Sequence, residues 1–141
     1  MYAPGATSLL ALSLLFLLSW TSCTAAPQPC LELTAREASI RDHAVRKVLP
    51  VFPSEAAQAN VSGVTVAKVR IDDKGVLTSI EIIQAPHPAI AQATIEAVKQ
   101  WEFKFYENKA MPECFNSKLT FYFFIEDGKA FVTDPKRFQK V

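Results

Sequence analysis

The stretch VTVAKVRIDDKGVLTSIEIIQ, residues 64–84, contains the pattern that decides the fold. Its first part alternates between residues that suit a buried face and charged residues, as a half-buried β-strand does. The group Asp72-Asp73-Lys74-Gly75 then has the chemistry of a hairpin turn, because Gly75 can adopt a positive φ. The stretch predicts an antiparallel hairpin whose inward face is lined by Thr65, Ala67, Val69 and Ile71.

A helix and another strand follow this hairpin. Pro88 suits the first turn of a helix, where its missing N–H costs nothing. A single apolar stripe then has helical spacing and consists of Ile90, Thr94, Ala97, Val98 and Trp101. KLTFYFFIE, residues 118–126, alternates as a strand does but is largely apolar on both faces. Gly128 turns the chain into KAFV, residues 129–132, a candidate short fourth strand.

The residues before the hairpin predict two helices. Thr34 and Glu37 match a capping box with Thr34 as the N-cap. Good helix formers continue to about Leu49. The segment LPVFP follows and is expected to be extended, because each proline favours extended geometry in the residue before it. Ser54 is then expected to cap a short helix over EAAQAN.

This order of elements indicates a small α+β domain. We expect an antiparallel sheet of three main strands, with KAFV as a candidate fourth, and helices packed on one face. Trp101 lies where the long helix ends, so it is expected to close that end of the core, with Phe103 continuing onto the flank of the sheet. The predicted divisions are a signal peptide over 1–25, a lead-in and N-terminal helix over 26–49, the domain over 50–133 and a tail over 134–141.

The first residues indicate export. Residues 9–20, LLALSLLFLLSW, form an uncharged apolar run that is too short for a comfortable membrane span. The small-residue stretch TSCTAAP follows, and this order predicts a secretory signal peptide cleaved after Ala25. A second interpretation is a lipoprotein signal that ends at Ser22, because Trp20-Thr21-Ser22-Cys23 resembles a bacterial lipobox with Cys23 as the lipidated residue.

The chain has three cysteines, and their positions limit which disulfides can form. Cleavage after Ala25 removes Cys23, and lipidation occupies its thiol, so Cys30 and Cys114 remain as a pair in either case. In an oxidising compartment this pair predicts a disulfide that closes a long loop. Two unpaired thiols are the alternative. No C-x-x-C pattern is present, so the sequence gives no support to a metal or redox motif.

Composition argues against several classes of function. The chain has 141 residues, 50% of them hydrophobic, and a formal net charge of +1, which is typical of one globular domain. Its basic residues are scattered, so no nucleic-acid partner is expected. No nucleophile elbow, P-loop or dinucleotide glycine pattern occurs, and His43 and His87 lie far apart in the sequence. We therefore expect no enzyme, no cofactor and no metal site.

The apolar strand offers a way to bind a protein. A strand near the end of a small sheet exposes backbone N–H and C=O groups unless something covers them. Such edges bind extended segments of partners by strand addition. Alternatively, KAFV or a second copy of the domain covers this edge. The candidate partner-binding edge consists of Lys118, Leu119, Thr120, Phe121, Tyr122, Phe123, Phe124 and Ile125.

Several spaced motifs resemble the TonB C-terminal domain of bacterial energy transducers. The family pattern is an aromatic-Pro pair, an Ala-rich short helix, a Gly before a strand, Asp-x-x-Gly, and a helix that ends Ala-Val-x-x-Trp-x-Phe/Tyr. The likeness covers about residues 50–133 and implies a periplasmic domain that binds outer-membrane receptors by strand addition to its last main strand, here 118–125. These features fall at Phe52-Pro53, Ala56, Gly63, Asp72 with Gly75, Ala97-Val98, Trp101 and Phe103.

Three departures separate this chain from full transducers. No Lys, Arg or His precedes Arg36, the long Pro-rich spacer is missing, and Leu49-Pro50-Val51-Phe52-Pro53 stands where the family has Gln-Pro-x-Tyr-Pro. We therefore predict a stand-alone periplasmic module that binds a protein or peptide partner in the bacterial envelope, such as an outer-membrane receptor. The alternatives are an energy transducer with residues 9–20 as an uncleaved anchor, and a self-associating envelope subunit or homodimer. Membrane contact is expected only through a lipid or that anchor.

Overall fold

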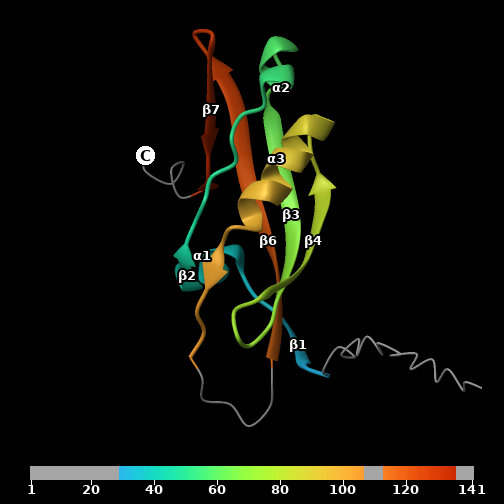
Figure 1. Cartoon of the computed structure of the whole chain (residues 1–141), viewed down its shortest axis with the longest axis vertical. Coiled ribbons are helices and arrows are strands. Elements are labelled where there is room, and N and C mark those ends of the chain that lie inside the picture. Colours follow the sequence, from blue (N-terminus) through green and yellow to red (C-terminus); the bar gives the residue numbers. More distant parts are fainter. Residues whose placement is uncertain (1–28, 107–112, 136–141) are drawn as a thin grey trace, which may run out of the picture.

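The computed structural model describes residues 29–106 and 113–135. The expected signal peptide, the lipobox with Cys23 and most of the expected tail lie outside these residues. No helix within them is both long and apolar enough to cross a membrane. The elements, in chain order (Figure 1), are β1 (Leu31–Thr34), α1 (Glu37–His43), β2 (Ala44–Arg46), α2 (Ser54–Gln58), β3 (Gly63–Ile71), β4 (Leu77–Gln84), α3 (Pro88–Val98), β5 (Glu102–Phe103), β6 (Glu113–Glu126) and β7 (Lys129–Thr133).

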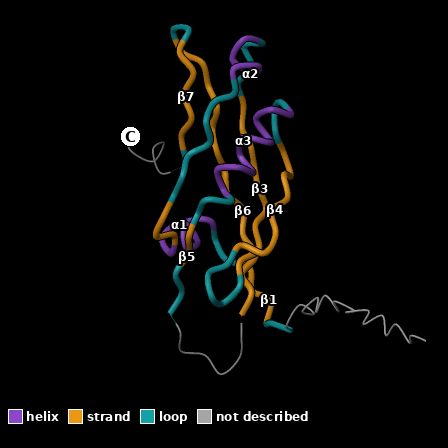
Figure 2. Tube along the Cα trace, viewed as in Figure 1, coloured by secondary structure: helices purple, strands orange, loops and turns teal. Residues whose placement is uncertain are grey.

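One mixed sheet forms the frame of the domain (Figure 2). Its strand order is β1-β6-β3-β4, and β7 also pairs with β6. The predicted hairpin is β3 and β4, and the candidate fourth strand is β7, all in antiparallel pairs. The sequence did not predict β1, which runs parallel to the start of β6 with Leu31 opposite Glu113. The α+β class is therefore confirmed, with one parallel pair added to the antiparallel sheet.

The turn between β3 and β4 requires glycine for two reasons. Gly75 has a φ of 82°, in the left-handed region that side chains disfavour. A Cβ atom at this position would also lie 2.1 Å from the carbonyl oxygen of Phe103 in β5. The Asp72 carboxylate accepts hydrogen bonds from the amides of Lys74 and Val76 at 3.0 and 2.8 Å. The turn residues therefore act as the sequence predicted, and the turn also packs against the chain that follows α3.

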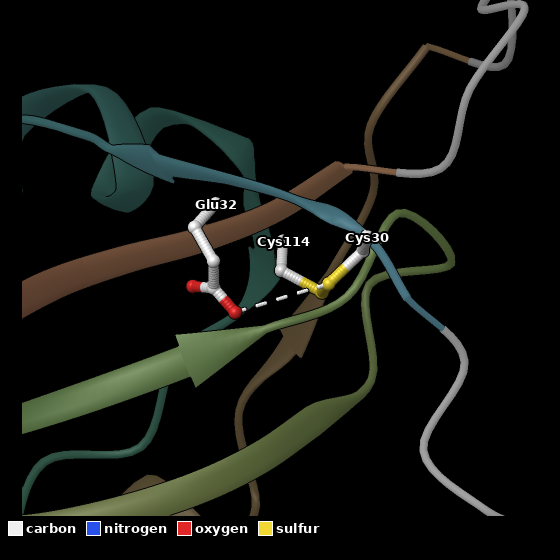
Figure 3. A group of neighbouring side chains, drawn as sticks. All are labelled: Cys30, Glu32 and Cys114. Carbon is white, nitrogen blue, oxygen red and sulfur yellow. Dashed lines mark hydrogen bonds between the residues drawn. A yellow bond between two sulfur atoms is a disulfide. The ribbon is translucent and has the colours of Figure 1, made fainter.

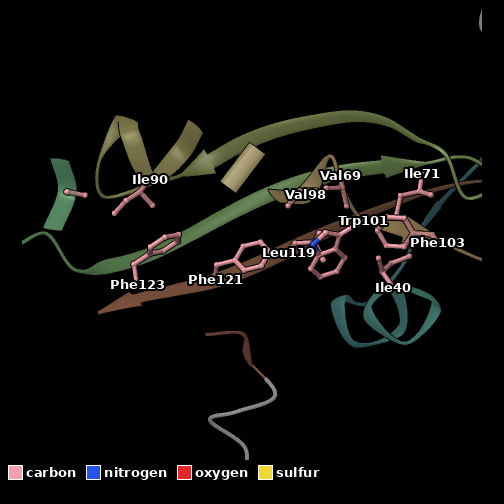
Figure 4. Close-up of a cluster of buried hydrophobic side chains, with 11 residues drawn as sticks. Ile40, Val69, Ile71, Ile90, Val98, Trp101, Phe103, Leu119, Phe121 and Phe123 are labelled. Atoms are coloured by element: carbon pink, nitrogen blue, oxygen red, sulfur yellow. The ribbon is translucent and has the colours of Figure 1, made fainter. Parts of the chain in front are cut away.

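The core lies between one face of the sheet and the helices (Figure 4). Ile40 of α1, Ala56 of α2 and Val98 of α3 belong to one buried cluster with the inward residues of β3 and β6, so the helices pack on one face as expected. Trp101 is 4% exposed and donates its Nε1–H to the carbonyl of Val48 at 2.8 Å. It closes the core at the end of α3, as predicted. The other members are Val69, Ile71, Ile90, Phe103, Leu119, Phe121 and Phe123.

The helix predicted from Thr34 to about Leu49 is wrong in both its start and its length. Thr34 ends β1, and α1 begins only at Glu37, with Arg36 as an N-cap that makes no side-chain cap bond. The strand β2 directly follows this short helix and pairs with β5. The capping-box pattern failed because the Glu37 carboxylate accepts hydrogen bonds from Thr120 of β6 instead.

The starts of the other two helices differ in how well the sequence predicts them. Pro53, rather than Ser54, is the N-cap of α2, and this helix ends before Asn60, whose φ is 52°. At the start of α3, the His87 ring accepts a hydrogen bond from the backbone amide two residues later. Pro88 occupies the first turn of α3 as predicted. The long helix is therefore better specified locally than the short one.

Candidate functional site

The strand that was predicted to bind a partner is the central strand of the sheet. β3 pairs with residues 115–123 of β6, which leaves the opposite side, here called the second edge of β6. On that side β1 pairs with residues 113–116, and β7 pairs with residues 122–126. The continuous open row expected over residues 118–125 is therefore absent from the described structure. The alternative in which KAFV covers the edge is correct for the part of β6 that pairs with β7, residues 122–126, here called the upper end of the second edge.

Side chains of α1 fill the gap between β1 and β7. The carbonyl of Asn116 accepts a hydrogen bond at 2.8 Å from the amide that follows β1. The amide of Thr120 donates to the Glu37 carboxylate at 2.7 Å, and its carbonyl accepts from the Arg41 guanidinium at 2.7 Å. Because alternate residues of a strand direct their backbone groups to the same side, Lys118 also faces this gap, where its carbonyl accepts a long hydrogen bond from the Ser117 hydroxyl at 3.5 Å. The second edge is thus covered along almost all of its length.

Arg41 lies at the centre of this covering. Its side chain is 2% exposed and lies over the rings of Trp101 and Phe121, at 5.3 and 5.2 Å from their centroids. It forms ion pairs with Glu37 at 2.8 Å and with Asp134, the residue after β7, at 3.4 Å. A guanidinium out of water needs such partners, since an unpaired buried charge is strongly destabilising. Arg41 therefore joins α1, β6 and the end of β7.

A tight turn connects β6 to β7. Asp127 and Gly128 both have positive φ, 50° and 72°. This is the pattern of a type I′ turn, whose twist matches that of a two-stranded hairpin. The pairing begins immediately outside the turn, with Glu126 opposite Lys129. The position of β7 is therefore set by a two-residue turn that lies away from the core.

Few side chains of β7 are buried. Its first two residues are exposed, and Phe131 is 41% exposed although its ring stacks on Phe124 with the centroids 5.3 Å apart. Only the far end packs inward, where Val132 contacts the core and Thr133 is buried. Elements with few buried contacts are the first to open in local unfolding. β7 is accordingly the part of the covering that we expect to open most readily.

A covalent bond holds β1 at the other end of the edge. Cys30 and Cys114 form the predicted disulfide, with Cα atoms 5.7 Å apart (Figure 3). Next to it, the Glu32 carboxylate accepts hydrogen bonds from Arg70, at 3.0 Å, and from Asn116. The bond from Arg70, and then that from Asn116, lowers the pKa of the Glu32 carboxyl. β1 is thus tied to β6 by a disulfide and to β3 by an ion pair.

The same three side chains raise the question of a metal site. The donor atoms of Cys30, Glu32 and Cys114 lie within 4.8 Å of one another. However, the two sulfur atoms are bonded to each other, and a metal-binding cysteine must supply a thiolate. In this oxidised form the group is a structural connection between two strands.

The residues of the predicted motifs serve the fold. Phe52 packs edge to face on Phe123 of β6, with ring centroids 5.5 Å apart, and Pro53 precedes α2. Gly63 begins β3 where a Cβ atom would lie 2.9 Å from the side chain of Pro86. The helix-end residues Val98, Trp101 and Phe103 are buried. The structure therefore does not bring the aromatic-Pro pair to the second edge of β6, but to the core face of that strand.

Sequence reasoning missed Glu37, Arg41 and Asp134 as parts of the site. The spacing of Glu37 and Arg41 by one helical turn indicates an ion pair on a helix. It does not indicate that both side chains reach a strand far along the chain. Asp134 begins the predicted tail, and no local pattern connects it to Arg41.

Comparison with known families identifies the family of this chain. Residues 48–125 match the family described as Gram-negative bacterial TonB protein C-terminal, which is more than half of the chain. The chain belongs to the TonB C-terminal domain family. No curated protein and no solved structure matches it. The family is non-catalytic, its domains are periplasmic, and membership implies interaction with outer-membrane receptors.

The limits of the TonB C-terminal domain bear directly on the second edge. Residues 48–125 contain α2, β3, β4, α3, β5 and all but the last residue of β6. β1, α1 and β7 lie outside this range. All the strands and side chains that cover the second edge of β6 therefore belong to segments outside the family domain.

Proposed function

We propose that this chain is a periplasmic interaction module that binds an extended segment of an envelope protein by strand addition. The partner strand pairs with residues 122–126 of β6, the upper part of the second edge, in the place of β7. An outer-membrane receptor is the partner that the family implies. One observation carries the proposal: every group that covers this edge comes from outside the TonB C-terminal domain, and β7 is the covering with few buried side chains.

The energetics of exchange favour this site. A partner strand replaces the backbone hydrogen bonds of β7 with equivalent bonds, so the ladder itself changes little in free energy. The cost of opening is mainly the loss of side-chain contacts, and those of β7 are concentrated at Val132 and Thr133. Specific affinity then comes from the side chains of the partner.

The coverings of the rest of the second edge are harder to displace than β7. Its lower end is closed by β1, which the Cys30–Cys114 disulfide holds in place. The middle is closed by Glu37 and Arg41, and Arg41 is buried among aromatic rings. Removing either of these coverings requires breaking a covalent bond or exposing a paired buried charge.

A covalent lock tests the proposal. Ile125 of β6 lies opposite Ala130 of β7, so Ile125→Cys with Ala130→Cys places two cysteines across the pair. The full chain, labelled with 15N, is titrated with synthetic peptides copied from the periplasm-facing N-terminal segments of outer-membrane receptors. We expect amide shifts at residues 122–126 in the wild type, none in the oxidised double variant, and their return after reduction.

The controls separate the lock from its side effects. Reductant also opens the Cys30–Cys114 disulfide, so the wild type is titrated with and without reductant. Each single cysteine variant is titrated as well, because it has the substitution without the lock. Binding that survives the oxidised lock, or shifts confined to another strand, overturns the proposed site.

A second candidate function is self-association, which the outer side of β4 favours. β4 is the last strand of the sheet order, and no strand of the described residues pairs with its outer side. Two copies pairing there would form a continuous sheet. Analytical ultracentrifugation at micromolar concentration tests this, and a monomer contradicts it. The remaining alternative, an energy transducer anchored by residues 9–20, predicts an intact mass that retains these residues.

A further inference from the structure

We propose that the partner segment carries an Asp or Glu whose carboxylate takes the place of Asp134 on Arg41. This inference rests on the proposed function and names the chemistry of the ligand. β7 occupies the upper part of the second edge although it lies outside the family domain. Its contacts therefore show which side chains an added strand can use there.

Arg41 keeps most of its surroundings when β7 leaves. Its Nε and Nη2 atoms contact the Glu37 carboxylate, its Nη2 also donates to the carbonyl of Thr120, and its plane lies over two rings of the core. All these groups belong to α1, β6 and the chain after α3. Only Asp134, which contacts Nη1 at 3.4 Å, departs with β7.

Glu37 cannot replace the lost carboxylate without breaking other bonds. One of its oxygens accepts from the amide of Thr120 at 2.7 Å, and the other accepts from the Thr120 hydroxyl at 2.9 Å. Opening β7 therefore leaves Nη1 of a nearly buried guanidinium without its anionic partner. A carboxylate is the group that best satisfies such a donor, because hydrogen bonds between ionised groups are the strong ones.

The register of β7 also defines where the acidic residue must lie. Phe131 lies opposite Phe124, Val132 lies opposite Phe123, and the acid comes three positions after the phenylalanine. The expected ligand is an extended segment, antiparallel to β6, with an aromatic or large apolar residue, an apolar residue, any residue and then an acid. This pattern combines stacking on the ring of Phe124, contact with the edge of the core and a charge-assisted bond to Arg41.

Two peptides in two hosts test the inference. The probes are the acetylated, amidated peptide Lys-Ala-Phe-Val-Thr-Asp, which copies residues 129–134, and the same peptide with Asn in the last position. The hosts are the full chain and its Asp134→Asn variant, both labelled with 15N. The acidic peptide is expected to bind about three- to tenfold more tightly than the Asn peptide in both hosts. The Asp134→Asn host should bind both peptides more tightly by one common factor, since β7 competes less well.

The Nε–H signal of Arg41 distinguishes a direct contact from a general effect. In the Asp134→Asn host it should shift with the acidic peptide and remain in place with the Asn peptide, while amides 122–126 shift with both. Equal affinities, or no response of this signal, overturn the carboxylate inference and leave strand addition intact. Absence of shifts at residues 122–126 with either peptide in both hosts refutes the proposed site as well. A peptide of reversed sequence that binds equally well contradicts the antiparallel spacing.

Discussion

Replacing Gly128 with valine should open β7 without disturbing the rest of the sheet. Gly128 has a φ of 72° in the turn between β6 and β7, and a Cβ atom added there meets no heavy atom within 4 Å. The substitution therefore acts through backbone conformation and creates no clash with a neighbour. A β-branched residue in the left-handed region costs about 1–2 kcal/mol. This cost falls on the closed hairpin and is relieved when β7 separates.

The expected effect is a five- to thirtyfold increase in the opening equilibrium of the hairpin, about 1–2 kcal/mol converted to a ratio. Native-state hydrogen exchange measures it residue by residue. Backbone direction alternates along a strand, so Tyr122 and Phe124 point their amides to the same side as Thr120, towards β7. These two amides and the β7 amides that face β6, those of Lys129, Phe131 and Thr133, should exchange faster by the same factor. The amides of β3 should keep their wild-type rates.

Gly128→Asn is the matched control, because asparagine tolerates the left-handed region much better than valine. It should show only a small fraction of the acceleration. If β3 exchanges faster by the same factor as β7, the hairpin does not open as a separate unit. If the amides of β7 are unaffected by valine, the turn does not determine the stability of this pair. Either result refutes the reasoning that makes β7 exchangeable.

Three further changes test the frame of the domain. Trp101→Phe removes the hydrogen bond to Val48 and part of the buried ring, so the free energy of unfolding in urea should fall by about 1–3 kcal/mol, with an unchanged m-value. Cys30→Ser with Cys114→Ser removes a disulfide between residues 84 apart, and the chain-entropy model gives a loss of about 4–5 kcal/mol, which reduced wild type should reproduce. The pKa of Glu32 is lower in the folded chain than its ordinary value, so its stabilising effect is present above the ordinary pKa and is lost as pH falls through the folded pKa. Glu32→Gln should therefore lower Tm at neutral pH and leave it unchanged in acid; an equal shift at both pH values contradicts this account.

The parts of the fold that were predicted from sequence are those whose signals are local. The hairpin of β3 and β4 has alternation on its first strand and a turn that requires Gly75, so the two strands that pair lie only a few residues apart in the sequence. α3 has a proline at its start and one apolar stripe that ends at Trp101. Each of these features is determined by residues that are close to one another in the sequence.

The site was predicted less well because its contacts are distant in sequence. The Thr34-Glu37 pattern is a valid local capping signal, but Glu37 instead accepts hydrogen bonds from Thr120, on a strand that follows α3. The pairing of β1 with β6 likewise joins Leu31 to Glu113. The apolar residues on both faces of β6 indicated a strand that is covered on both sides. They do not distinguish an edge strand, which a partner covers, from a central one.

The disulfide near the start of β6 also fixes which side chains β6 presents at residues 122–126. A slip of one residue along β6 would turn Phe124 inward and Phe123 outward, exchanging the two faces of the strand. The Cys30–Cys114 bond and the long pairing with β3 prevent such a slip even while β7 is away. Under the proposed function, every added strand would therefore face the same order of β6 side chains, and a short sequence could be recognised without any rearrangement of the core.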